Sequence, residues 1–315
     1  MERFLYMMKS VMIGHAIGDA LGVPVEFCDR ADLDESPVTD MMGFGSYPVP
    51  AGAWSDDTSM ALAALDSLSK GSVNYDEIME NLVRWCSEDA YTPTGEMFDI
   101  GRTCLTAIRN YLATDGKPAL ECGLTDEHSN GNGSLMRIHP FVLYASANNL
   151  PFGEWLELVK NGSTITHAHD RAELGCLIYA FVLFHLLGDP NKDSITLGLK
   201  RAECHLRDCA EMEHYGRIFK SDFASIDRKE IKSSGYVVDT LEAALWCLMT
   251  TNDYKSCVLK AVNLGEDTDT VAAVAGGLAG ILYGYDKIPQ EWKDTLIKRD
   301  YIENLCKVAC ETWFR

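Results

Sequence analysis

Apolar residues recur along this chain at the three- and four-residue spacing that is typical of helices. In residues 4–22, for example, Leu5, Met8 and Met12 follow this spacing. We find no convincing alternation of apolar and polar residues of the kind that indicates β-strands. The pattern therefore predicts an all-α protein. No low-complexity segment or long linker interrupts the chain, so we expect one domain over residues 1–315.

The pattern also gives approximate bounds for individual helices. A polar region of mixed charge over residues 188–233 is the least informative part, and we expect it to be mainly helical. Residues 75–89 and 291–310 are amphipathic, which is typical of helices with one face on the core. The remaining predicted helices are more apolar and cover residues 4–22, 59–68, 102–112, 170–187, 241–249 and 268–284.

Two of these helices carry small residues at every fourth position, which places them on one face of each helix. They are Gly14, Gly18 and Gly22 in the first, and Ala272, Gly276, Gly280 and Gly284 in the last. Glycine inside a helix costs about 0.5–1 kcal/mol relative to alanine, so a stripe of it indicates a closely packed backbone. We therefore predict that these two helices pack against each other and close the chain into one unit.

Acidic and hydroxyl side chains gather where the last of these helices begins. Residues 265–270 read GEDTDT, with three carboxylates and two hydroxyls in six positions, and Asp267 is a good N-cap. One cap is worth only about 1 kcal/mol, which does not explain so much repelling charge. Carboxylate and hydroxyl oxygens are the ligands that Mg²⁺, Mn²⁺ and Ca²⁺ prefer. A bound cation would offset the repulsion.

The helix predicted at 59–68 begins in the same way, with Ser55, Asp56, Asp57 and Thr58. Alone, such a start is usually only a cap. Two of them in one chain favour a site for two divalent cations, held together by Asp56, Asp57, Asp267 and Asp269.

Several other residues are candidates for chemistry, each with a simpler alternative. Glu26 lies between apolar neighbours, although it could be a surface acid, and by pattern alone Asp99 is better explained as an N-cap. The glycines of residues 131–137, together with Arg137, could admit an anion, or they could form a tight turn. His167 could face a ligand, or its segment could only cap a helix. We interpret His15 and Asp19 as a buried, hydrogen-bonded structural pair.

The net charge of −19 changes the list of expected partners. It argues against a general nucleic-acid surface or an anionic-membrane surface, since both need basic patches, although a local phosphate site stays possible. The apolar part of residues 268–284 is shorter than the roughly 20 residues that cross a bilayer. Eleven cysteines lie without a CxxC pair, which predicts a reducing, cytoplasmic environment with buried free thiols.

Seven motifs together resemble the ADP-ribosylglycohydrolase family, in that family's order and over nearly the whole chain. They are GHAIGDALGVPVEF, GAWSDDTSMALAAL, FDIG, GNGSLMR, THAHDRAELG, SGYVVDTLEAALW and GEDTDTVAAVAGG. The resemblance implies a compact, single-domain orthogonal helix bundle with a binuclear Mg²⁺ or Mn²⁺ centre. It also implies hydrolysis of the glycosidic bond between ADP-ribose and an acceptor. The FDIG motif resembles the branch that acts on dinitrogenase reductase and removes ADP-ribose from arginine.

The resemblance also implies roles for individual residues, at the positions where this sequence matches the family's motifs. The implied metal ligands are Ser55, Asp56, Asp57, Asp267, Asp269 and Thr270. The implied catalytic residues are Glu26, Asp99, Asp56 and Asp269, with Glu26 or Asp99 handling the proton. The implied substrate-binding residues are Asn132, Gly133, Ser134, Met136 and His167, for the diphosphate and riboses, and Tyr236, for the adenine. Two positions depart from the family: Ser55 stands where many members have Thr, and Glu266 where many have Gly.

We therefore expect a monomeric enzyme that acts on an ADP-ribosylated protein, most simply at arginine, or on a small ADP-ribose conjugate. Three alternatives stay open. The chain could be a catalytically silent ADP-ribose-binding or structural relative. It could hydrolyse another linkage, to serine, a small molecule or a nucleic-acid end. The acidic clusters alone would also suit a different two-metal hydrolase, such as a phosphoesterase.

Overall fold

The computed structural model describes residues 1–113 and 116–315. Within these residues the regular structure is helical, apart from two isolated bridges, which join Leu124 to His167 and Gly131 to Tyr236. The α-helices are α1 (Glu2–Gly22), α2 (Arg30–Glu35), α3 (Asp56–Leu68), α4 (Tyr75–Glu88), α5 (Arg102–Ala113), α6 (His139–Ala147), α7 (Phe152–Thr164), α8 (Asp170–Gly188), α9 (Lys192–Leu206), α10 (Val237–Thr250), α11 (Tyr254–Val262), α12 (Thr268–Tyr283), α13 (Gln290–Thr295) and α14 (Arg299–Trp313). Short 3-10 turns join them at Val23–Val25, Ala119–Glu121, Glu127–Ser129, Leu135–Arg137, Ala210–Tyr215, Phe223–Ser225, Arg228–Glu230 and Tyr285–Lys287.

The all-α class predicted from the sequence is confirmed, with two local differences. The region 188–233 contains only one α-helix, α9, followed by 3-10 turns and loops. The predicted C-terminal helix is divided into α13 and α14, because Lys298 takes a left-handed conformation with φ of 52° between them.

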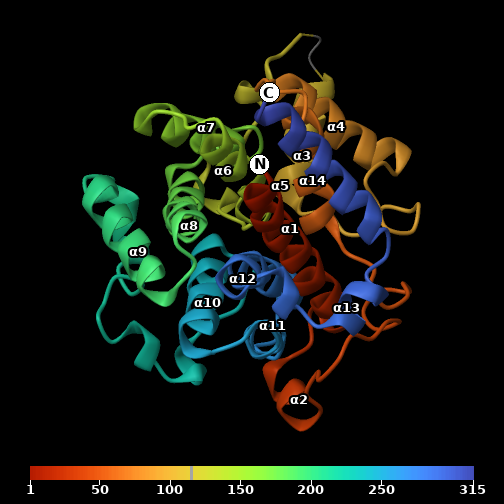
Figure 1. The fold of residues 1–315 in the computed structure, drawn as a ribbon, viewed down its shortest axis with the longest axis vertical. Coiled ribbons are helices and arrows are strands. Elements are labelled where there is room, and N and C mark those ends of the chain that lie inside the picture. The colour runs from red at the N-terminus through yellow and green to blue at the C-terminus, as the bar shows by residue number, and fades with distance from the viewer. Residues whose placement is uncertain (114–115) are drawn as a thin grey trace.

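The two glycine stripes pack against each other, as predicted. A Cβ atom added at Gly18 would lie 2.1 Å from the carbonyl oxygen of Ala272, and one at Gly280 would lie 2.0 Å from that of Ser10. Only glycine lets the two backbones approach this closely. In Figure 1, α1 and α12 accordingly lie side by side at the centre of the molecule. The last glycine of α1, Gly22, meets the backbone of Asp269 and so fixes where α12 begins.

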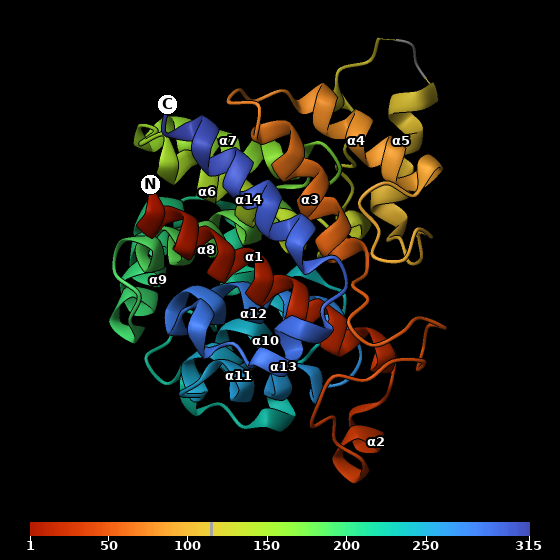
Figure 2. The ribbon, with the colours of Figure 1, turned by 45° about the vertical axis from the view of Figure 1, so that its right-hand side comes forward.

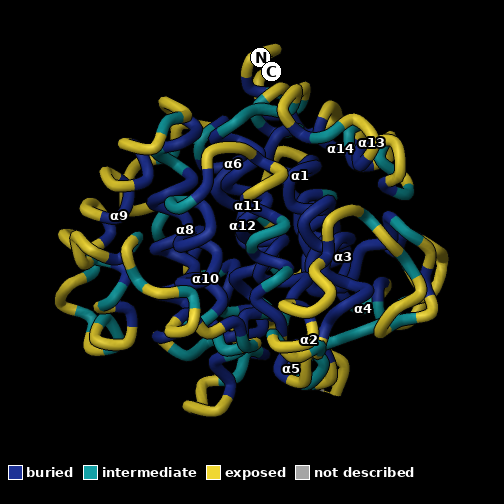
Figure 3. The backbone as a smooth tube through the Cα atoms, turned by 90° about the horizontal axis from the view of Figure 1, so that it is seen from below, coloured by how far each residue is buried: buried dark blue, intermediate teal, exposed yellow. Residues whose placement is uncertain are grey.

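Most of the core is one apolar cluster that extends from Phe4 to Trp313, and Val23, Val49 and Ala53 form a second, much smaller one. Helix α12 is apolar on all sides, which is typical of a helix in the centre of a protein, and Figure 3 shows it enclosed by other buried segments. Both ends of the chain meet, since the rings of Phe4 and Phe314 lie 5.3 Å apart, and α14 runs beside α1 in Figure 2.

Helix α8 also belongs to this interior. By length and composition alone it could cross a membrane, but 83% of its apolar window is buried inside the fold. All eleven cysteines are free thiols, and seven of them are buried, whereas Cys204 is exposed.

Candidate metal centre and cleft

Acidic side chains from three helices converge near the centre of the molecule. Ligand oxygens of Asp19, Asp57 and Asp269 lie within 4.8 Å of one another, and so do those of Glu26, Asp267 and Asp269. The two groups share Asp269. Two neighbouring groups of oxygens with a common carboxylate are the arrangement that a pair of divalent cations needs.

The fold brings these acids together through the helix ends. Helix α12 starts at Thr268, whose hydroxyl donates to the carbonyl oxygen of Gly22 at the end of α1. Helix α3 starts at Asp56, with Ser55 as its N-cap. The prediction that Asp267 takes the N-cap position of α12 is confirmed, but its side chain does not cap. Instead, Asp267 Oδ2 accepts a hydrogen bond of 2.7 Å from the side-chain amide of Asn132.

Asp19 anchors the start of α3, and sequence reasoning missed this role. Its Oδ1 accepts hydrogen bonds from the backbone N–H and the hydroxyl of Ser55, and its Oδ2 accepts from those of Thr58, at 2.6–3.0 Å. The expected pair of Asp19 with His15 is wrong. Both His15 nitrogens are without a hydrogen-bond partner in the described part of the chain, and the ring packs 4.3 Å from that of His139.

The acids present free oxygens. Among residues 1–113 and 116–315, Asp57 Oδ1, Asp269 Oδ2 and Glu26 Oε2 are buried and have no hydrogen-bond partner. Burial raises the pKa of Asp56, Asp57 and Asp269 well above its ordinary value. Buried, unpaired carboxylates are costly unless a cation pairs with them, so this donor set fits hard divalent ions.

The two predicted hydroxyl ligands stand beside the same carboxylate. Ser55 Oγ lies 3.0 Å from Asp57 Oδ2, which shares the single hydroxyl hydrogen with Asp19 Oδ1, and Thr270 Oγ1 donates to Asp57 Oδ2 at 3.3 Å. Each hydroxyl oxygen keeps lone pairs that a cation could use.

A cleft of about 380 Å³ opens next to this cluster. Its acidic wall contains Glu26, Asp56, Asp99, Asp267 and Thr270, whereas Ser55, Asp57 and Asp269 lie behind it in the interior. Asp99 is not the N-cap that its pattern suggested. It takes a left-handed conformation, with φ of 57°, three residues before α5 begins.

Two carboxyl groups of this wall bind protons more strongly than carboxyl groups in water do. Burial, followed by the charges of Asp99 and Asp267, raises the pKa of Glu26 to about 8. Burial and the charge of Asp267 also raise the pKa of Asp99.

A second, neutral wall comes from the predicted anion loop. Asn132, Gly133, Met136 and His167 line the cleft, as does Gly131. Ser134 does not reach it, because its buried hydroxyl lies 2.8 Å from Ser163 Oγ and 3.4 Å from Cys176 Sγ.

Two further residues of this region lie away from the cleft. Tyr236 is outside the lining, half-buried, with its ring 6.0 Å from the Arg171 guanidinium. Arg137 points away from the cleft into the interior, so it does not add charge to the loop by direct contact.

Two loops at the mouth of the cleft are joined by reciprocal hydrogen bonds. The N–H of Phe27 donates to the carbonyl oxygen of Glu266, and the N–H of Glu266 donates to that of Cys28. Phe27 and Glu266 both take left-handed conformations, with φ of 67° and 61°. Glycine adopts this conformation more readily than glutamate or phenylalanine, so both loops are locally constrained at these positions.

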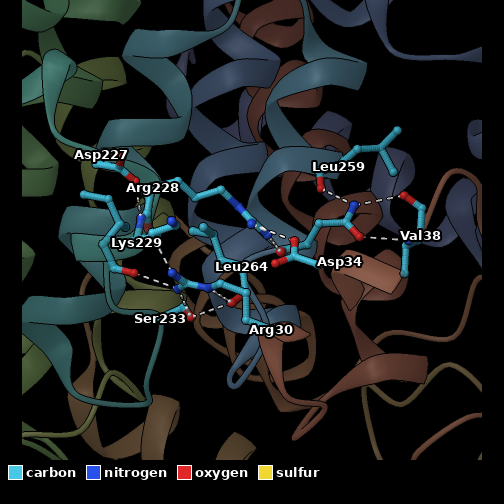
Figure 4. Close-up of polar contacts among 11 residues, drawn as sticks. Arg30, Asp34, Val38, Asp227, Arg228, Lys229, Ser233, Leu259 and Leu264 are labelled. Atoms are coloured by element: carbon cyan, nitrogen blue, oxygen red, sulfur yellow. Dashed lines mark hydrogen bonds and ion pairs between the residues drawn. The ribbon is translucent and has the colours of Figure 1, made fainter. Parts of the chain in front are cut away.

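Arg30 strengthens this junction from outside the cleft (Figure 4). Its guanidinium donates to the carbonyl oxygens of Leu264, Arg228 and Ile231 at 2.6–2.8 Å. These bonds hold the segment after Glu26 against the loop that carries Asp267. Arg30 stands in a short polar stretch, and nothing in its local sequence indicates this role.

With the fold and the site described, comparison with known proteins identifies the class. The ADP-ribosylglycohydrolase family model matches residues 5–314. This chain therefore belongs to the ADP-ribosylglycohydrolase family.

Individual relatives agree with this assignment. An ADP-ribosylarginine hydrolase Tri1 of Pseudomonas putida (strain GB-1) is 35% identical over 307 residues, which cover 97% of this chain and 78% of the relative. The ADP-ribosyl-[dinitrogen reductase] glycohydrolase of Rhodospirillum rubrum is 31% identical over 287 residues, which cover 90% of this chain and 88% of the relative. A solved ADP-ribosylglycohydrolase-related protein complex superposes over the whole of both chains, with a TM-score of 0.83 and 30% identity.

Proposed function

We propose that this chain hydrolyses the N-glycosidic bond between ADP-ribose and the arginine side chain of a modified protein, in a reaction that depends on two divalent cations. The observation that carries the proposal is the double acidic cluster around Asp269, which adjoins a cleft that is also lined by the neutral loop around Gly133 and by His167. The choice of arginine is supported by the relatives from Pseudomonas and Rhodospirillum described above.

The residues present fit Mg²⁺ or Mn²⁺. We propose Ser55, Asp56, Asp57, Asp267, Asp269 and Thr270 as the ligands, because they supply carboxylate and hydroxyl oxygens on two facing helix starts. When bound, such cations would orient the ribose hydroxyls and increase the acidity of a nearby water.

The chain itself supplies the proton chemistry. Cleavage at C1 of ribose passes through a state with oxocarbenium character, which the negative charge of the acidic wall would stabilise. Glu26 and Asp99 both line the cleft. The pKa of Glu26, about 8, suits a group that exchanges protons near neutral pH, and burial and the charge of Asp267 raise the pKa of Asp99 as well. The arginine departs readily only when its guanidinium is protonated before the C1–N bond breaks, because the bond electrons then leave on a neutral guanidine, and Asp99 would keep that proton on the substrate.

The mouth of the cleft offers a place for the acceptor. Phe27 lines the cleft, and 72% of its surface is exposed, next to Glu26. An exposed aromatic face beside carboxylates can bind a guanidinium by cation–π and ionic interactions. We propose that the arginine side chain lies against Phe27 while the ADP-ribose enters the cleft.

We further propose that the substrate is a modified protein or a small ADP-ribose conjugate, that the enzyme acts as a monomer and that it acts in the cytoplasm. The reduced cysteines support a reducing compartment. The net charge of −19 argues against a general nucleic-acid or anionic-membrane surface.

A panel of conjugates tests the proposal. ADP-ribose linked to arginine or serine, in peptides of otherwise equal sequence, is incubated with the enzyme and Mg²⁺ or Mn²⁺, and then with excess chelator. We expect intact ADP-ribose to be released faster from arginine, and only with the cation.

Each alternative gives a different result in this assay. Faster release from serine would contradict the arginine assignment. Products cleaved within the diphosphate would indicate a phosphoesterase. Binding of ADP-ribose without any release would indicate a silent relative.

A further inference from the structure

Arg137 is a completely buried cation at the base of the neutral wall. None of the ion pairs within residues 1–113 and 116–315 involves it. Its Nη1 donates to the carbonyl oxygen of Gly162 at 2.9 Å, and its Nη2 donates to Thr166 Oγ1 at 2.6 Å. A buried charge without a counter-ion is costly, so its retention in this protein calls for an explanation.

The hydrogen bond from Arg137 to Thr166 bears on the direction of the hydrogen bond between Thr166 and His167. A guanidinium can only donate, so Thr166 Oγ1 accepts from Arg137. The hydroxyl then has its own hydrogen to give, and His167 Nδ1 lies 2.8 Å away. Among the hydrogen bonds of the described residues, Nδ1 is the acceptor that this hydrogen can reach, and when Thr166 donates to it, Nδ1 is the unprotonated nitrogen of the ring. The proton of a neutral His167 is consequently on Nε2.

The rest of His167 is held equally firmly. Its backbone N–H donates to the carbonyl oxygen of Ser163 at 2.8 Å, and its own carbonyl oxygen accepts from Ser163 Oγ at 2.9 Å. The ring lines the cleft. A Cβ atom added at Gly131 or Gly133 would lie 3.7 or 3.5 Å from Nε2, so both glycines leave the space beside this nitrogen open.

We propose that Arg137 and Thr166 are positioning residues that hold His167 as a neutral imidazole with its Nε2–H directed into the cleft, as a donor for the diphosphate of ADP-ribose. The ligand rests on the proposed function, whereas the tautomer rests on the hydrogen bonds alone. The buried charge of Arg137 also favours an anion on this side of the cleft. Consistent with a neutral ring, burial and Arg137 lower the pKa of His167 to about 3.

Nitrogen-15 NMR of histidine-labelled full-length protein tests the tautomer directly. We expect the His167 signals, assigned with a His167→Asn variant, to show protonated Nε2 and unprotonated Nδ1. In Thr166→Val, which has nearly the same shape but no hydroxyl, this preference should be lost, and Thr166→Ser should restore it. Thr164→Val is the matched control, since the Thr164 hydroxyl binds Lys160 and Glu173 instead. A wild-type ring protonated on Nδ1 would overturn the proposal.

Calorimetry with ADP-ribose and with adenosine as probes tests the role in binding. Thr166→Val should weaken ADP-ribose binding about 3- to 10-fold, as expected for one lost hydrogen bond, and should leave adenosine binding unchanged. Equal loss for both probes, or none for either, would overturn the role in diphosphate binding. If the wild-type protein did not bind ADP-ribose, the proposed function would fail, while the NMR result would still decide the tautomer.

Discussion

The two walls of the cleft differ in charge and in how their polar atoms are satisfied. The acidic side of the cleft has carboxylates with unpaired oxygens, both on the wall itself, at Glu26 Oε2, and directly behind it, at Asp269 Oδ2. Behind the neutral wall, the polar atoms of Ser134, Thr166 and Ser163 bond to one another or to neighbouring side chains. Bound cations would complete the first wall, whereas the second is already organised by its own hydrogen bonds. This difference suits a ligand whose ribose meets the cations and whose diphosphate meets fixed donors.

Replacing Asp269 by Asn should have the largest effect, because this carboxylate belongs to both acidic groups. Loss of a residue that supports a metal ligand from outside typically reduces metal affinity or activity about 10- to 100-fold. Loss of a ligand shared by two ions should therefore reduce kcat more than about 100-fold. Turnover of an ADP-ribosylated arginine peptide and calorimetric titration with Mn²⁺ would measure it. Asp193→Asn, an exposed change of the same kind on α9, is the control. Full turnover of Asp269→Asn in excess chelator would contradict the metal centre.

Replacing Asp19 by Asn should have a smaller effect, because this residue positions Ser55 and Thr58. The asparagine side chain has one oxygen that accepts hydrogen bonds, whereas Asp19 has two. The N–H and hydroxyl of either Ser55 or Thr58 therefore lose their acceptor. We expect cation affinity to fall about 10- to 100-fold, with kcat recovering at high Mn²⁺ concentration. If affinity stayed at the wild-type value, Asp19 would have no part in holding the site.

The acidic wall should also make the metal-free protein sensitive to pH. The folded protein keeps protons on Glu26, whose pKa is about 8, at pH values where the unfolded chain has lost them. The unfolded state then binds fewer protons, so the free energy of unfolding falls as pH rises from about 4.5 to about 8. Thermal melts in chelator should show Tm falling across this window. Saturating Mg²⁺ should remove most of the slope, and an equal slope with and without cations would contradict this account.

The parts of the fold that depend on spacing along one helix could be predicted from the sequence. The glycine stripes predicted the packing of α1 on α12, because each stripe is a property of a single helix. The paired acids likewise predicted a shared cluster, since charge repulsion is visible in the sequence itself. Asp57, Asp267 and Asp269 join it in the structure, whereas Asp56 lines the cleft and belongs to neither acidic group.

Roles that depend on distant partners could not be predicted. Asp19 binds residues 36 and 39 positions away, so its neighbours on α1 gave no indication of this. The sequence placed Arg137 beside an anion loop, but the direction of its side chain depends on Gly162 and Thr166 of other elements. Glu26 stood out because an acid between apolar residues is unusual, yet Arg30, four positions later, did not.

The smallest expected effect concerns the mouth of the cleft, where Phe27 would face the arginine. A cation–π contact at an exposed site is worth about 0.5–1 kcal/mol, so Phe27→Ala should raise KM for an arginine conjugate about two- to fivefold. Inhibition by free ADP-ribose should not change, because the product lacks the acceptor. Phe44→Ala is a close control, since Phe44 is equally exposed and left-handed, with φ of 58°, but does not line the cleft. Phe27→Tyr, which keeps an aromatic face, should behave like the wild type. If Phe27→Ala weakened ADP-ribose and the conjugate equally, the ring would belong to the nucleotide side of the cleft instead.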